Sequence, residues 1–203
     1  MLDKSLPYYD IIMKATYSSA TTHKIIDLPK GYHYKFYEDG DELHWAKIET
    51  SVDEFENLDA ALAYFHRVFA PHKDILSKRM CFILNTKNEY VATATAWYKE
   101  DETSHFPLLH WVSVLPSVQG LGLGKAIVVY ALHQFLNVET SKTIYLHTQT
   151  WSAAAVALYA KLGFHITYDS FFMQTTDKEA KTILETVLKK EILAILFIDN
   201  KIE

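Results

Sequence analysis

The sequence contains little cysteine and no long hydrophobic run. Cys81 is the single cysteine, so no internal disulfide can form, and we expect it to be a small buried residue of a cytoplasmic protein. No apolar run approaches the roughly twenty residues that a membrane-spanning helix needs, and residues 1–10 lack the apolar stretch of a secretory signal. With 203 residues and 49% hydrophobic content, the chain fits a single domain over residues 1–203.

An excess of basic residues is also absent. The chain has 20 basic and 25 acidic residues, and its formal net charge of −5 argues against a nucleic-acid or anionic-membrane partner. Residues 38–59 hold nine acids against one lysine, so this segment carries −8 and the rest of the chain +3. Such a concentration of charge either steers a cationic ligand or forms a pair of solvated helix faces. The nine acids are Glu38, Asp39, Asp41, Glu42, Glu49, Asp53, Glu54, Glu56 and Asp59.

Glycine is scarce as well, and its distribution is uneven. Three of only six glycines, Gly120, Gly122 and Gly124, fall within five residues. Glycine permits positive φ and the close approach of another group to the backbone, so this short stretch needs one of these properties. A tight turn without a ligand is the simpler alternative.

The apolar patterns predict a mixed α/β fold. Strands are expected at 32–37, 80–85, 90–98, 108–115, 143–148 and 164–168, and helices at 41–50, 58–69, 121–136, 152–162 and 177–190. The helix at 121–136 is apolar on nearly every side, so we expect it to be buried. Residues 192–198 either extend the last helix or form a last strand.

The two ends of the chain are less regular. Residues 1–30 are rich in turn residues and are expected to form an arm that folds onto the body. Residues 171–203 are expected to form a C-terminal extension, and its apolar content is compatible with a homodimer.

The glycine cluster lies where a predicted strand is followed by a predicted helix. Pro116 ends the strand, and residues 119–125 lead into the helix. The first N–H groups of a helix have no partner inside it, and together with the helix dipole they favour an anion. Glycines at this place remove the Cβ atoms that would hold a phosphate away, so the sequence predicts a cradle for a pyrophosphate-type group.

Two common phosphate-binding motifs do not fit this loop. A Walker A loop needs glycine where Gln119 stands and serine or threonine where Ala126 stands. The dinucleotide fingerprint fails at its third glycine, because Lys125 occupies that place when the motif starts at Gly120. That fingerprint also follows the first strand of a βαβ unit, whereas this loop follows several strands and two helices.

The segment Gln119-Gly120-Leu121-Gly122-Leu123-Gly124 resembles the Q/R-x-x-G-x-G/A signature of the GNAT superfamily of N-acetyltransferases. The preceding V-x-V-x-P at 112–116 is similar to the strand before that loop, and AVALYAKLGF at 155–164 is similar to the family's A-[IV]-x-L-Y-x-K-x-G-F segment. The order and spacing agree over about residues 80–168. The resemblance implies a GNAT-like fold, with a central mixed twisted sheet flanked by helices and splayed strands forming an acetyl-CoA cleft.

The resemblance also implies roles for individual residues. Acetyl-CoA is the implied co-substrate, and no metal is implied. Ser152 stands where the family often has asparagine, and we expect it to cap the following helix or to bind the pantetheine arm. Tyr159 is the implied acid that protonates the departing thiolate, or else a buried aromatic residue. The implied cofactor-binding residues are Val112, Ser113, Val114, Gln119, Gly120, Leu121, Gly122, Leu123, Gly124, Lys125 and Ser152.

Acyl transfer to an amine needs a hydrogen-bond donor for the carbonyl oxygen and a base for the amine proton. By its position in the family's strand, the backbone N–H of Val114 is the expected donor. His110 lies two residues before Val112, on the same face of a regular strand, and is the candidate base unless it is a structural histidine. Glu42 or Glu49 could serve instead.

The function that follows is N-acetyl transfer from acetyl-CoA to a primary amine. The acidic segment favours a cationic acceptor such as a polyamine, an aminoglycoside or a lysine side chain. The alternative is a catalytically silent module that binds or senses acyl-CoA.

Overall fold

The computed structural model describes residues 2–100, 102, 104–169, 171 and 174–198. Its strands are β1 (Asp10–Thr16), β2 (His33–Phe36), β3 (Met80–Leu84), β4 (Tyr90–Glu100), β5 (His105–Val114), β6 (Thr143–Gln149) and β7 (His165–Ile166). Its helices are α1 (Tyr17–Ala20), α2 (Glu42–Ser51), α3 (Leu58–Val68), α4 (Lys73–Arg79), α5 (Leu123–Val138), α6 (Ala153–Lys161), α7 (Ala180–Val187) and α8 (Lys190–Leu196).

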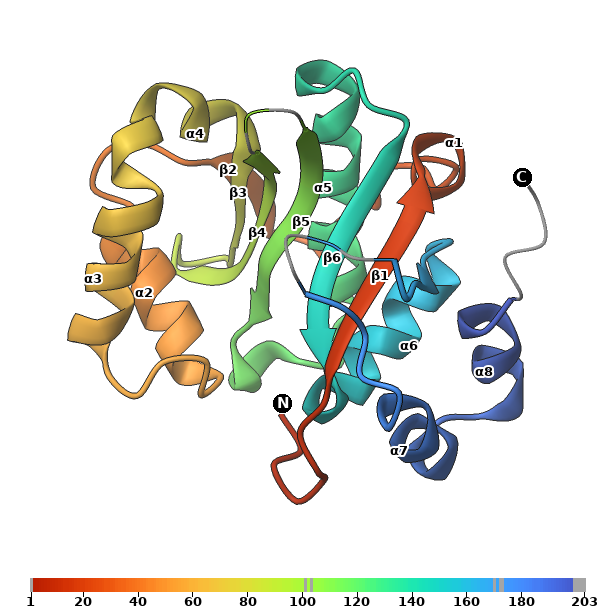
Figure 1. Cartoon of the computed structure of the whole chain (residues 1–203). Helices are drawn as coiled ribbons and strands as arrows, with labels where there is room; N and C mark the ends of the chain where they lie inside the picture. The colour runs from red at the N-terminus through yellow and green to blue at the C-terminus, as the bar shows by residue number, and fades with distance from the viewer. Residues whose placement is uncertain (1, 101, 103, 170, 172–173, 199–203) are drawn as a thin grey trace. The chain divides into compact units, whose positions relative to one another are not determined.

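The strands form one mixed sheet in the order β2-β3-β4-β5-β6-β1-β7 (Figure 1). Strands β5 and β6 are parallel, with Leu108 opposite Tyr145, whereas β1 is antiparallel to both β6 and β7. The expected mixed α/β class is therefore confirmed. The chain divides into two compact units: the first holds residues 1–23, 98–108 and 141–203, and the second holds residues 24–97 and 109–140.

In the second unit, helices cover both faces of the strands. Met80, Phe82 and Leu84 alternate along β3 and pack in one cluster with Trp45 of α2 and Phe65 of α3. On β2, Tyr34 stacks on Tyr130 of α5, with ring centroids 4.1 Å apart. Figure 1 shows α2 and α3 side by side next to β2–β4, and α5 behind the strands.

Helix α5 is the buried helix that the sequence predicts. Its buried positions lie on nearly all sides, and Ile127, Val128, Val129, Ala131 and Leu132 have no exposed surface. A helix that is apolar all round has to be covered all round. Since its first turn follows the glycine loop, this packing holds the loop's end in place.

The first unit contains a strand that the sequence analysis did not predict. Within the expected arm of residues 1–30, β1 pairs with β6 along its whole length, from Asp10 opposite Gln149 to Thr16 opposite Thr143. Ile11, Ile12 and Met13 are fully buried, so both faces of this strand are covered. Residues 10–16 of the expected arm thus form a strand within the sheet.

Other boundaries also differ from expectation. Pro71 does end the α3 segment, but it lies in a 3₁₀ turn at 70–72 that leads into the unpredicted α4. Residues 190–196 form the separate helix α8, so the alternative of a last strand is wrong. Residues 199–203 of the expected C-terminal extension lie outside the described residues. Cys81 is fully buried, as expected.

Within the described ranges, the chain contains no helix of the length and apolar character needed to cross a bilayer.

Candidate functional site

The glycine loop adopts a backbone that only glycine takes without strain. Gly120 has φ +85° and Gly122, the N-cap of α5, has φ +80°. A Cβ atom built at either position would meet no atom within 4 Å, so the loop faces open space here. Positive φ alone explains these two glycines.

Gly124 is the more informative residue. It lies in the first turn of α5 without positive φ, and a Cβ built there would lie 3.8 Å from Val114 Cγ2, an ordinary contact. Neither backbone conformation nor packing within this chain requires glycine at this place. A bound group that approaches the backbone closely would require it, so the loop fits the predicted pyrophosphate-type ligand.

The rest of the loop is arranged around the same corner. The Gln119 side chain donates to the carbonyl oxygen of Val114 at 3.1 Å, which joins the loop to the end of β5. Leu121 is 52% exposed and Lys125 is also exposed, whereas Leu123 is buried in the core. Among the implied cofactor-binding residues, Leu123 can therefore contribute only through its backbone.

Strand β5 is irregular just before the loop. Trp111 has φ +47°, a conformation that is strained for a bulky residue. Its Nε1 donates to the Tyr64 hydroxyl at 3.1 Å, and His110 Nε2 lies 3.2 Å from the same hydroxyl. Consecutive side chains of a regular strand point to opposite faces. The regular alternation that would place His110 on the face of Val112 is therefore interrupted at Trp111.

The second unit also contains a buried carboxyl beside this strand. Glu49 of α2 is fully buried, and its Oε2 accepts a hydrogen bond from the Ser113 hydroxyl at 2.7 Å. Burial raises the pKa of Glu49 from 4.5 to about 8, aided by the charge of Glu54 and opposed by the bond from Ser113. Ser113 lies between Val112 and Val114, so Glu49 is hydrogen-bonded directly to the strand whose residues the family resemblance assigns to acetyl-CoA binding.

The other acid considered from the sequence has a different environment. Oε2 of Glu42 accepts from the Tyr37 hydroxyl at 3.1 Å and from the Gly40 backbone N–H at 3.0 Å. Partial burial would raise the pKa of Glu42, but a hydrogen bond from its own backbone N–H, these two bonds and the charge of Lys73 together hold the pKa below its usual value. A base needs a pKa near the working pH, so Glu49 suits that role better than Glu42.

The sequence itself carried a signal for the burial of Glu49. Trp45, Glu49 and Val52 share the i, i+4, i+7 spacing of one helix stripe, and that stripe faces the core. Within the strongly acidic segment, an acid on this stripe was not distinguished from its solvated neighbours.

Tyr159 and Ser152 lie in the first unit. Tyr159, on α6, is 6% exposed, and its ring makes an edge contact with Phe164 at 6.1 Å. Ser152 is at the N-cap of α6, but its side chain makes no capping hydrogen bond, so the expected capping role is wrong. Gly163 ends the helix with φ +92°, in agreement with the predicted stop.

Residues at the start of the chain support this helix. Trp151 Nε1 donates to the carbonyl oxygen of Leu6 at 2.7 Å, and the Asp3 N–H donates to the Trp151 carbonyl at 2.9 Å. The Thr150 hydroxyl, which is fully buried, accepts from the Tyr9 N–H at 3.1 Å. The segment 3–9 thus holds the turn from which α6 begins, a role that the sequence did not reveal.

Comparison with known proteins identifies the family. Residues 41–164 match the acetyltransferase (GNAT) family. The mycothiol acetyltransferase of Streptomyces griseus is 37% identical over 68 residues, which cover 34% of this chain and 22% of that protein.

Solved structures share the fold. A GCN5-related N-acetyltransferase from Sphaerobacter thermophilus has a TM-score of 0.55 at 17% identity, over 80% of this chain and 50% of that one. A tandem GNAT protein from the clavulanic acid biosynthesis pathway has a TM-score of 0.58 at 13% identity, over 77% of this chain and 49% of that one. The chain thus spans about half the length of these structures. Because the family match covers more than half of the residues and includes both the glycine loop and α6, the chain belongs to the acetyltransferase (GNAT) family.

Proposed function

We propose that the protein is an N-acetyltransferase that transfers the acetyl group of acetyl-CoA to a primary amine. The observation that carries the proposal is Gly124, a glycine that the chain's own geometry does not require, in the first turn of a helix whose N–H groups point to an open loop. Family membership supports acyl transfer as the class of reaction.

The residues of the loop would hold the pyrophosphate of coenzyme A. The backbone N–H groups of residues 120–125 supply donors, and Lys125 adds a positive charge at the helix N-terminus. When bound, acetyl-CoA supplies the activated acetyl group as a thioester. The backbone N–H of Val114 is the proposed donor to the carbonyl oxygen, where negative charge develops.

The proposed proton acceptor is Glu49, acting through Ser113. The Ser113 hydroxyl can accept a proton from the amine while it passes its own proton to Glu49 Oε2, to which it is already hydrogen-bonded. This route requires the ionised form of Glu49, and a pKa of about 8 leaves part of the population ionised near neutral pH. His110 remains the second candidate, although its ring nitrogen is already paired with Tyr64.

Tyr159 is the proposed acid for the departing thiolate, a role implied by its place in the family motif. Ser152 is proposed to contact the pantetheine arm, since its hydroxyl makes no cap on α6.

The variant Gly124→Ala tests the loop. Alanine fits the space at this position, and in a helix it is more stable than glycine by up to about 1 kcal/mol. We therefore expect unchanged or higher thermal stability together with at least about tenfold weaker coenzyme A binding in calorimetry. Leu136→Ala, an exposed position at the other end of α5, is the control and should bind normally. Wild-type affinity in Gly124→Ala would contradict the proposed cradle.

Turnover separates transfer from binding alone. Release of free thiol from acetyl-CoA should depend on added primary amine. Coenzyme A binding without amine-dependent thiol release across a panel of amines would instead identify a silent acyl-CoA-binding module.

A further inference from the structure

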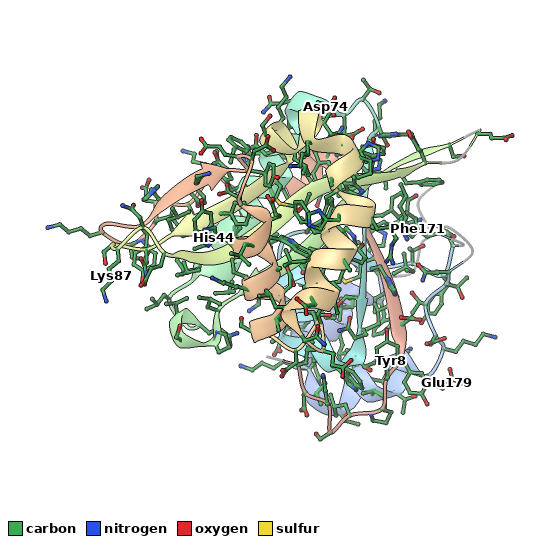
Figure 2. All side chains as sticks on the ribbon, turned by 90° about the vertical axis from the view of Figure 1, so that its left-hand side faces the viewer. Tyr8, His44, Asp74, Lys87, Phe171 and Glu179 are labelled. Carbon is green, nitrogen blue, oxygen red and sulfur yellow. The ribbon has the colours of Figure 1, made fainter. Side chains whose placement is uncertain are left out.

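Three aromatic side chains of the second unit form a partly exposed cluster beside Glu49 and Ser113. Phe55 stacks on Trp111 with ring centroids 5.0 Å apart, Tyr64 meets Trp111 at 5.0 Å, and Phe55 meets Tyr64 at 5.5 Å. None of the three is fully buried. We call Phe55, Tyr64 and Trp111 the aromatic cluster. Figure 2 looks onto α2 and α3, the helices that lie on either side of Phe55 in the sequence.

The aromatic cluster is held rigidly. Trp45, which is fully buried, lies beneath it with ring centroids between 5.7 and 6.1 Å from all three rings. Trp111 is fixed by its bond to the Tyr64 hydroxyl and by a backbone at φ +47°. Strain that is retained in a packed element points to a functional position. Rigid rings lose little entropy when they bind a flat partner.

The charge around the aromatic cluster is negative. Asp53, Glu54, Glu56 and Asp59 are all exposed and lie within four residues of Phe55. One cationic side chain lies at the aromatic cluster: the Arg67 guanidinium is 5.4 Å from the centre of the Tyr64 ring. The Arg67 contact shows that a cation can lie over a ring of this cluster.

Helix α2, whose Trp45 packs against the three rings, carries two buried polar atoms. Among the described residues, Glu49 Oε1 and Trp45 Nε1 are buried without a hydrogen-bond partner. The two residues are one helical turn apart on α2 and therefore on one face. Buried polar atoms normally have a hydrogen-bond partner, so these two atoms are free to bond to a polar group, whether water or ligand, that enters between them and the rings.

We propose that the acceptor is a primary ammonium ion whose carbon skeleton carries an aromatic ring or a similarly flat apolar group. The ring packs against the aromatic cluster, the four exposed acids attract the positive charge, and the nitrogen is directed toward Ser113 and Glu49. This inference rests on the proposed N-acetyl transfer. A polyamine would use the acids but would add no flat apolar group to the exposed part of the aromatic cluster.

Amine selectivity tests the proposal. With the full chain and acetyl-CoA, we expect kcat/KM for phenethylamine to exceed kcat/KM for both butylamine and spermidine by at least tenfold, measured as thiol release. In Phe55→Ala, the phenethylamine-to-butylamine ratio should fall about tenfold. Leu43→Ala, which removes an exposed apolar side chain from α2, is the matched control and should keep the wild-type ratio.

The outcomes separate this inference from the function on which it rests. Equal rates with all three amines, a preference for spermidine, or an unchanged ratio in Phe55→Ala would overturn the aromatic-amine acceptor while N-acetyl transfer stands. If no amine supports thiol release, calorimetry of phenethylamine with the protein and coenzyme A decides. Phenethylamine binding that Phe55→Ala weakens about tenfold supports the ligand class, and no phenethylamine binding overturns it.

Discussion

The carboxyl group of Glu49 is fully buried, and burial disfavours its charged form. In the unfolded chain its carboxyl ionises near pH 4.5, whereas in the folded chain burial raises this pKa to about 8. Between these two values the folded state binds one proton more than the unfolded state. The free energy of unfolding therefore falls as the pH rises through this window and levels off above it.

Glu49→Gln should remove this dependence. At pH 5 the wild type and the variant both carry a neutral side chain, so their stabilities should be close. By pH 9 the variant should be more stable by a few kcal/mol, on the order of 1.4 kcal/mol for each unit of raised pKa. The same variant should lose about 10²-fold or more in kcat, since it can no longer accept a proton.

Thermal denaturation from pH 5 to pH 9 measures the first effect. Glu56→Gln, an exposed acid five residues after the end of α2, serves as the control and should follow the wild-type curve. Parallel curves for the wild type and Glu49→Gln would show that Glu49 titrates normally.

At the scale of the elements, the residues at the N-caps of α2 and α3, Asp41 and Asn57, are similar in type but make different hydrogen bonds. Asn57 caps α3, since its Oδ1 accepts the Ala60 N–H at 2.9 Å. Asp41 holds the same position before α2 but makes no such cap. Its carboxyl, 6% exposed, instead accepts from Lys35 Nζ and the Tyr90 hydroxyl, each at 2.6 Å.

Removing these two side chains should therefore lower the free energy of unfolding by different amounts. Asn57→Ala loses one cap, for which about 1 kcal/mol is expected. Asp41→Ala takes the acceptor away from the Tyr90 hydroxyl and the Glu38 N–H and removes one carboxylate from Lys35, so we expect a loss of about 3 kcal/mol. Denaturant titration of both variants gives the comparison, with Asn57→Asp as a variant that keeps the cap. Equal losses would mean that the Asp41 network adds nothing beyond a helix cap.

The elements that the sequence predicted are those whose causes are local. The α5 helix follows from the apolar residues within its own 16 positions, and β3 and β4 follow from the short apolar runs at 80–85 and 90–98. The β1 strand was missed because its pairing partner β6 lies more than 120 residues away. The kink at Trp111 was missed because no tryptophan is expected at positive φ, and the contacts of its ring with Tyr64 and Trp45 come from distant parts of the chain.

At the scale of the whole molecule, the distribution of charge matters more than its total. Of the nine acids at 38–59, Asp41 and Glu49 are buried and Glu42 is partly buried, so six remain exposed. The interpretation as fully solvated helix faces is therefore wrong for part of the segment. The exposed remainder is still strongly negative and can act on a cation at a distance.

The negative electrostatic field of these exposed acids predicts that kcat/KM for a cationic amine depends on salt concentration. The triple variant Asp53→Asn, Glu54→Gln, Glu56→Gln should lower kcat/KM for a cationic amine at low ionic strength and should weaken its fall between about 0.05 and 0.5 M salt, over which the screening length shortens several-fold. The matched control neutralises three exposed acids of the first unit, Glu179, Glu185 and Glu191, one of which is labelled in Figure 2. Identical salt profiles for the two triple variants would exclude steering by residues 53–56.

Of the candidate site, the sequence predicted the glycine loop but not the Glu49–Ser113 pair. The glycine loop was recognised because its residues are consecutive and their chemistry is carried by the backbone. The Glu49–Ser113 pair joins residues 64 positions apart, and only the folded chain brings a helix acid onto that strand. Sequence alone could name Glu49 as one candidate among several acids, but Glu42 lies seven residues earlier on the same helix stripe, so that stripe did not separate the two.

The pairing of β1 with β6 has a consequence for biosynthesis. A ribosome makes residues 10–16 long before residues 143–149, so Ile11, Ile12 and Met13 leave the exit tunnel without the strand that will shield them. Until translation reaches Gln149, this exposed apolar segment is expected to bind a chaperone. Nascent chains that stall before that point should aggregate, whereas those released after it can close the sheet around their earliest strand.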